Sequence, residues 1–137
     1  MKYLLDTNVL SELLKGKPDP AVIEWMKIHQ SVCAMSSLTL AEMAAGIEKL
    51  PEGKRRNALT KELSFLQEDF AEKILAVDEI VAWEWARHTT EAQKAGFNPA
   101  LIDSLIAATA KANGLTIVTR NTTDFPLMQV INSFTPT

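Results

Sequence analysis

Residues 2–8 read Lys-Tyr-Leu-Leu-Asp-Thr-Asn (KYLLDTN), and this stretch gives the first indication of the architecture. The apolar run from Tyr3 to Leu5 is typical of a short buried strand. The polar residues that follow begin a turn, and a short helix is expected around 9–14. Because Asp6 comes directly after the strand, it lies where α/β proteins build their binding sites, at the carboxyl end of a strand.

The same alternation of short β-rich runs and longer helical patterns continues along the chain. Further strands are predicted at 31–35, 73–77, 115–119 and, at an edge, 129–132. Helices are predicted at 20–29, 39–50, 54–70, 78–96 and 98–114. Strands that alternate with helices favour a mainly parallel sheet, here of four to five strands, with helices on both faces. We therefore expect a three-layer α/β/α fold.

Length and composition are those of a soluble domain. The 137 residues are 47% apolar and 23% charged, and we expect a single domain over 1–137. The lone cysteine, Cys33, excludes an internal disulfide, and no apolar run is long enough for a membrane span, so we expect a cytoplasmic protein with no membrane partner. The net charge of −3 does not by itself indicate nucleic-acid binding. A polyanionic ligand would require a local basic cluster, a bound metal or both.

Asp6 and Asp103 are predicted at positions that are unusual for a solvated surface aspartate. Asp6 follows the first strand directly, although it or Asn8 could simply cap the next helix. Asp103 is predicted mid-helix among small and apolar neighbours, where an unpaired carboxylate would be partly buried at a cost in free energy unless a cation compensates it. If that helix begins at Pro99, Asp103 is instead a first-turn residue favoured by the helix dipole.

Three further residues are open to a binding role or to a local one. Glu42 stands three residues after Thr39, and the pair matches a capping box, although the small residues beside Glu42 would leave room for a ligand. Asn121 and Asp124 follow the strand predicted at 115–119, so they should lie at the same end of the sheet as Asp6. Either could supply oxygen to a metal or belong to a surface loop with an Asx turn.

An all-oxygen cluster of this kind suits Mg²⁺, a hard ion that one or two carboxylates hold while it keeps several waters. Bound there, the ion would activate a water and stabilise charge on a scissile phosphate. The sequence offers no rival nucleophile: it has no Ser-His-Asp order, glycine-rich phosphate loop or Cys/His metal spacing, and His29 and His88 are isolated. These residues therefore indicate metal-dependent phosphodiester cleavage.

Four blocks of the sequence resemble those of VapC-like PIN-domain toxins, especially the FitB branch. They are LLDTNVLSEL at 4–13, LTLAEMAAGI at 38–47, ALIDSLIAATA at 100–110 and LTIVTRNTTDF at 115–125. They occur in the family's order and span nearly the whole chain. The resemblance implies a PIN-like α/β/α domain with Mg²⁺- or Mn²⁺-dependent endoribonuclease activity, often on tRNA or structured rRNA. It also implies homodimerisation, neutralisation by a small antitoxin, and larger complexes with antitoxin and operator DNA.

The family's acidic residues map onto this chain one at a time. The first three, which bind the metal and serve catalysis, correspond to Asp6, Glu42 and Asp103. Where many members have an Asp directly after Thr-Arg, this chain has Asn121, with Asp124 three residues later. The resemblance therefore leaves the fourth ligand open between Asn121 and Asp124, and we expect Asp124 to take part in catalysis.

Several polar and basic residues are expected to assist the acidic ones. Thr7, Asn8 and Asn121 match positions near the metal, so the resemblance implies that they support it through hydrogen bonds. The expected RNA contacts come from the basic cluster of the helix at 54–70 and from the loop after the fourth strand: Lys54, Arg55, Arg56 and Arg120.

Two other functions remain open from the sequence. The chain could be a non-enzymatic dimeric regulator that binds RNA or DNA. It could also be a phosphotransfer enzyme with Asp6 as its nucleophile, which fits less well. Haloacid-dehalogenase-type phosphatases have an Asp two residues later, where this chain has Asn8. Receiver domains have a Lys after their last strand, whereas the fourth predicted strand here is followed by Arg120.

Overall fold

The structure of the chain is a computed structural model that describes residues 1–135. Over these residues five parallel strands form one sheet in the order β3-β2-β1-β4-β5: β1 (Tyr3–Leu5), β2 (Cys33–Ser36), β3 (Ile74–Leu75), β4 (Thr116–Val118) and β5 (Val130–Ile131). The central strand is β1, in which Leu4 pairs with Ala34 on one side and Ile117 on the other. The strand order reverses between β1 and β4, so a binding site is expected at their carboxyl ends.

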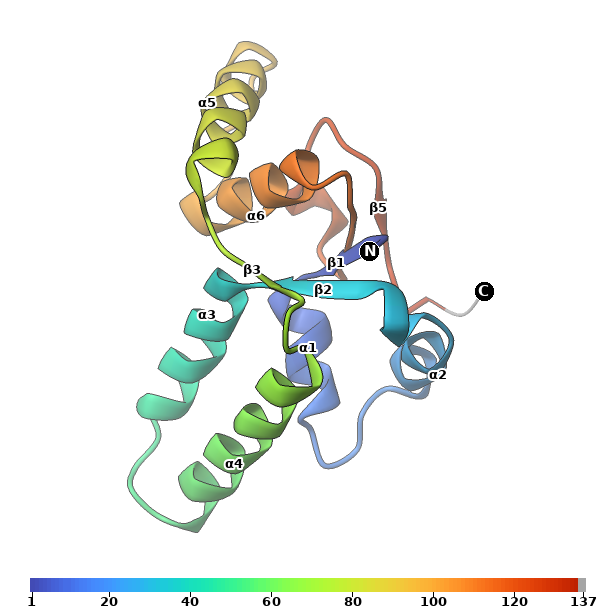
Figure 1. Ribbon diagram of the computed structural model, residues 1–137, viewed down its shortest axis with the longest axis vertical. Helices are drawn as coiled ribbons and strands as arrows, with labels where there is room; N and C mark the ends of the chain where they lie inside the picture. Colours follow the sequence, from blue (N-terminus) through green and yellow to red (C-terminus); the bar gives the residue numbers. More distant parts are fainter. Residues whose placement is uncertain (136–137) are drawn as a thin grey trace.

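Helices cover both faces of this sheet, as Figure 1 shows. The lower face in that view carries α1 (Thr7–Leu13), α2 (Pro20–His29), α3 (Ser37–Glu48) and α4 (Lys54–Asp69). The upper face carries α5 (Glu79–Lys94) and α6 (Leu101–Ala112). Short 3-10 turns follow α2 and β4, namely η1 (Gln30–Val32) and η2 (Thr122–Asp124). The predicted three-layer α/β/α architecture is therefore confirmed, including the strand at the edge.

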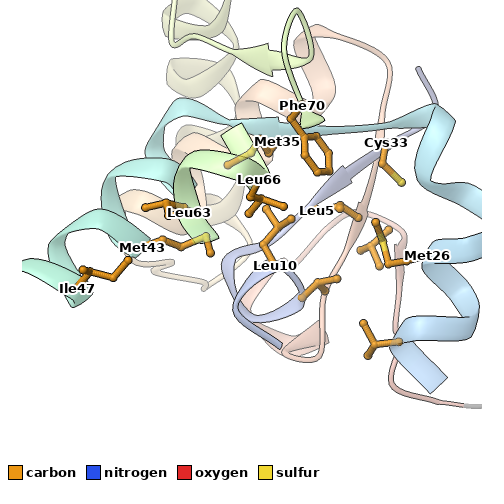
Figure 2. Packing of buried hydrophobic residues seen from close by; sticks show 13 residues of the cluster. Leu5, Leu10, Met26, Cys33, Met35, Met43, Ile47, Leu63, Leu66 and Phe70 are labelled. Atoms are coloured by element: carbon orange, nitrogen blue, oxygen red, sulfur yellow. The ribbon is translucent and has the colours of Figure 1, made fainter. Parts of the chain in front are cut away.

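The apolar run of β1 is buried on both faces, because a strand points alternate side chains to opposite sides of the sheet. Leu4 has no exposed surface and belongs to the cluster that includes Ile106 of α6. Leu5 is equally buried and belongs to the larger cluster on the other face, which includes Leu10 of α1 (Figure 2). Packing from both sides fixes the end of β1, and with it the position of Asp6.

Three helix starts differ from the sequence prediction. Helix α1 begins at Thr7, two residues before the predicted start, because the side chain of Asp6 accepts the backbone N–H of Thr7 and caps the helix. Helix α3 begins at Ser37, two residues before the predicted start, because the hydroxyl of Ser36 accepts the backbone N–H of Leu38 at 3.0 Å and caps the helix there. Helix α6 begins only at Leu101, because Ala100 is still extended (φ −61°, ψ 152°). The prediction that Asp103 lies mid-helix is therefore wrong, since it lies in the first turn of α6. No helix within residues 1–135 combines the length and the apolar character needed to cross a bilayer.

Candidate functional site

Asp6 is both a helix cap and a buried anion. It is only 6% exposed at the end of β1. Its Oδ1 accepts the backbone N–H of Thr7 at 2.8 Å, which caps α1. Its Oδ2 accepts the hydroxyl of Thr119 at 2.9 Å and the side-chain amide of Asn8 at 3.2 Å. Three donors thus orient one carboxylate, and a capping role does not exclude a role in binding.

Thr119 is the residue of this network that the sequence analysis missed. It is fully buried directly after β4, and its hydroxyl accepts the Nδ2–H of Asn8 at 3.0 Å and the backbone N–H of Asn121 at 3.0 Å. A hydroxyl has one proton and two lone pairs, so its remaining proton is directed to Asp6. The signal was present in the sequence, because Thr119 follows Ile117-Val118 in the way that Asp6 follows Leu4-Leu5.

Asn8 joins the loop after β1 to the loop after β4. Its Nδ2 donates to both Asp6 and Thr119, and its Oδ1 accepts the backbone N–H of Arg120 at 3.0 Å. The expected supporting residues Asn8 and Asn121 therefore lie in the network, although Asn121 joins it through its backbone amide. These bonds hold the carboxyl ends of β1 and β4 in a fixed relation.

Glu42 extends an exposed side chain from α3 toward the start of α1. Its Oε1 accepts the hydroxyl of Thr7 at 2.6 Å, and the same hydroxyl lies 3.5 Å from that of Thr39. Because α3 is capped by Ser36 and not by Thr39, Glu42 does not belong to a capping box. Thr7 and Glu42 come from different helices, so their contact brings the second acidic block next to the first.

The four expected carboxylates act on one another electrostatically. Burial raises the pKa of Asp103 to about 6, and the negative charges of Asp6, Asp124 and Glu42 add to the rise. Burial also raises the pKa of Asp6; its hydrogen bonds from Thr119 and Thr7 lower it in part, and the charges of Glu42 and Asp124 raise it further. Asp103 and Asp124 also line one cavity beside the cluster. The acidic residues of all four sequence blocks therefore gather at one end of the sheet.

The donor chemistry of this cluster fits a divalent cation. Within residues 1–135, no group of three or more His, Cys, Asp or Glu side chains is arranged to hold a metal ion. Mg²⁺ does not require such a group, because one or two carboxylates and several waters complete its shell. Four carboxylates, with no thiol or imidazole among them, offer the oxygen ligands that Mg²⁺ and Mn²⁺ prefer. Their mutual repulsion, seen in the raised pKa of Asp103, is what a cation would relieve.

The basic residues expected to contact RNA lie apart from the carboxylates or are engaged elsewhere. Lys54, Arg55 and Arg56 begin α4, at the end of the α3–α4 pair remote from the sheet (Figure 1), and Arg56 pairs with Glu48 at 2.5 Å. The guanidinium of Arg120 stacks 3.8 Å from the ring centroid of Phe134 and lies 3.9 Å from Oε1 of Glu12. Their contact with RNA stays a prediction.

The carboxylate cluster predicts how the stability of the metal-free protein depends on pH. Because the folded state raises the pKa of Asp103 from 3.8 to about 6, this group favours folding at low pH and loses that contribution as pH rises through about 6. Burial lowers the pKa of His88, and this group therefore makes the folded state more stable as pH rises over the same range. The test for Asp103 is therefore a comparison between the parent protein and the Asp103→Asn variant, because His88 contributes equally to both. In EDTA, we expect Asp103→Asn to melt at a higher temperature than the parent protein at pH 7. The difference between the two melting temperatures should become smaller toward pH 5. A difference that does not change with pH would contradict the raised pKa of Asp103.

Comparison with known proteins relates this geometry to a family. The sequence matches the PIN domain family over residues 3–128. It is 40% identical to Toxin FitB of Neisseria gonorrhoeae over 125 residues, covering 89% of each chain. It is 34% identical to VapC ribonuclease Y4jK of Sinorhizobium fredii, covering 97% of this chain and 98% of the relative. The solved structure of FitAB bound to an IR36 DNA fragment superposes with a TM-score of 0.91 at 36% identity, over 97% of this chain and 96% of the matched chain.

Proposed function

Because the chain belongs to the PIN-domain family, we propose that it is a metal-dependent endoribonuclease and the toxin of a type II toxin–antitoxin pair. The observation that carries the proposal is the gathering of four carboxylates near the carboxyl ends of β1 and β4, where the charges of Glu42 and Asp124 help to raise the pKa values of Asp6 and Asp103. The relatives named as a toxin and as a VapC ribonuclease, which match nearly the whole chain, support it.

Asp6, Glu42 and Asp103 would hold Mg²⁺ or Mn²⁺, one or two of them directly and the rest through its waters, and Asp124 would border the same site. When bound, the cation lowers the pKa of a coordinated water and stabilises charge on the scissile phosphate. The residues of the chain supply orientation: Thr119, Asn8 and the backbone of Thr7 fix the carboxylate of Asp6 through three hydrogen bonds.

Thr7 has a further part in the proposed site. Its hydroxyl holds Oε1 of Glu42 at 2.6 Å, so the exposed carboxylate is kept toward the start of α1. Thr7 would thereby orient Glu42 as one of the residues proposed to hold the cation.

The proposed partners are RNA as substrate, a small antitoxin and, in the complex with the antitoxin, operator DNA. The matched structure of FitAB on DNA supports the last two. A second copy of the chain is a further proposed partner. Ile80 and Trp83 lie three residues apart on one face of α5 and are 63% and 69% exposed, and contiguous exposed apolar patches often mark protein interfaces.

The test is incubation of the purified protein with total cellular RNA in Mg²⁺, in Mn²⁺ and in EDTA, followed by mapping of new 5′ ends. We expect a small number of defined cleavage sites with either metal and none in EDTA. Attack by water, in contrast to attack by the ribose 2′-hydroxyl, leaves no 2′,3′-cyclic phosphate, and this can be checked on a purified fragment. The matched control for contaminating nuclease is Asp103→Asn purified in parallel. Equal cleavage in EDTA, or by that control, would contradict the proposal.

A further inference from the structure

A small cavity opens beside the carboxylate cluster, between the loop that joins α5 to α6 and the turn η2. Its volume is about 220 Å³. The residues that line it include Phe97, Asn98, Pro99, Asp103, Thr123 and Asp124. Pockets for drug-sized ligands are usually larger, roughly 300–1,000 Å³, so this one suits a single small planar group. Because Asp103 and Asp124 belong to the cluster as well, a group in the cavity would lie next to the proposed metal.

Phe97 forms one wall of the cavity and is held there by its backbone. Helix α5 ends at Lys94, and Gly96 lies just beyond it with a φ of +87°, the left-handed conformation that favours glycine. The N–H of Phe97 then donates to the carbonyl of Ala92 at 2.8 Å, and that of Gly96 to Gln93 at 3.1 Å, which is a Schellman motif. Such motifs usually place an apolar residue here to pack against the helix, yet Phe97 remains 45% exposed. Packing within the motif therefore does not account for the whole ring.

The charge of the cavity decides which part of a nucleotide can enter. Its lining includes two carboxylates, and no lysine or arginine is among the lining residues. A phosphate would be repelled there, whereas a neutral heterocycle would not. The ring of Phe97 offers a flat apolar face, and the exposed Asn98 and Thr123 offer an amide and a hydroxyl. These are the groups that proteins use to stack and hydrogen-bond an unpaired base of RNA.

We propose that this cavity is a subsite for one unpaired nucleobase next to the scissile phosphate, with Phe97 as its stacking wall. The proposal rests on the proposed ribonuclease function and adds a source of base selectivity to it. A base seated against Phe97 would leave the phosphate of its own nucleotide outside the cavity, on the side where the cluster and the proposed cation lie. Asn98 and Thr123 would contact the edge of the base, so they are the residues expected to distinguish one base from another.

The test uses short single-stranded RNAs that contain a single bond that the protein cleaves. Each of the four bases is placed in turn on either side of that bond. Phe97→Leu keeps an apolar residue in the loop that follows α5 but removes the flat ring, whereas Phe97→Tyr keeps the ring. We expect Phe97→Leu to lower kcat/KM by roughly 5- to 150-fold, the range for loss of one base–aromatic stack. It should also weaken the base preference at one position, while Phe97→Tyr preserves both. The matched control is Phe65→Leu on α4, since Phe65 is similarly exposed at 53% and does not line the cavity.

A cycle with an abasic nucleotide separates stacking from a structural role. In the parent protein, removal of the base at the selected position should slow cleavage about as much as Phe97→Leu does, and the two changes together should cost little more than either alone. If Phe97→Leu slows the normal and the abasic substrate equally, the subsite is wrong. If the parent protein cleaves no RNA, the proposed function is wrong. In that case the same cycle is measured as RNA binding, by fluorescence anisotropy in Ca²⁺. Coupling between the effects of Phe97→Leu and of base removal on affinity supports the subsite, and absence of coupling overturns the subsite.

Discussion

Asp103→Asn is expected to reduce RNA cleavage by more than about 100-fold, because replacing even the outer partners of a metal ligand typically costs about 10- to 100-fold. The same variant should melt at a higher temperature than the parent protein in EDTA at pH 7. The reason is that burial and the charges of Asp6, Asp124 and Glu42 disfavour the anionic form of Asp103 and raise its pKa to about 6. A loss of activity together with a gain of stability would distinguish a binding residue from one that holds the fold.

Asp6→Asn provides a sharper comparison. It should also lose cleavage, but it should gain less stability than Asp103→Asn, or lose some. The two oxygens of Asp6 accept from Thr7, Thr119 and Asn8, and an amide group would turn one of those acceptors into a donor. The control for charge alone is Asp69→Asn, at the exposed end of α4. Melting in EDTA and single-turnover cleavage in Mg²⁺ measure the two effects, and full activity of both site variants would end the nuclease proposal.

The sequence was most informative where a local pattern predicts which distant residues come together in the fold. An apolar triplet followed by Asp6 predicts a strand end, and strand ends in parallel sheets meet at one edge. The same reasoning placed Asn121 and Asp124 after β4, and the structure places them there. It failed to single out Thr119, because a threonine after a strand is unremarkable until a buried carboxylate is known to face it. That partner lies 113 residues away along the chain.

Helix starts were less predictable, because several residue types cap equally well. Ser36 and Thr39 are both good N-caps by type, and the choice between them depends on where β2 ends. The sheet fixes that end, since Ser36 pairs with Leu75 across the β2–β3 ladder. Once Ser36 caps α3, Glu42 is free to accept the hydroxyl of Thr7. A local motif therefore suggested the wrong partner for Glu42, and tertiary pairing supplied the right one.

The start of α6 shows a second limit of local reasoning. Asn98-Pro99 has the signature of a helix start, yet Ala100 remains extended and its carbonyl accepts the first helical N–H, that of Ser104, at 2.9 Å. The delayed start shortens the helix and leaves residues 97–100 as a loop. That loop contains Phe97 and Asn98, which line the proposed base subsite. The error in the predicted boundary thus falls on a segment that borders the candidate site.

Ile106→Ala is expected to lower the free energy of unfolding by about 2–5 kcal/mol, the usual range for removing a large aliphatic side chain from a core. Ile106 has no exposed surface and belongs, with Leu4 and Ile117, to the cluster between α6 and the sheet. The loss is large against the roughly 5–15 kcal/mol that stabilises most domains. In urea unfolding, the lower stability should appear as a lower midpoint concentration of urea, with an unchanged dependence of the unfolding free energy on urea concentration.

Leu101→Ala is the matched control, because it removes a similar side chain from the same helix at a position that is 62% exposed. It should change stability by no more than about 0.5 kcal/mol. Asp103 lies between these two positions, so the packing that seats Ile106 also holds the partly buried carboxylate near Asp6. Equal effects of the two substitutions would mean that α6 is not held by this cluster, and the position of Asp103 beside the other acids would then lack its physical basis.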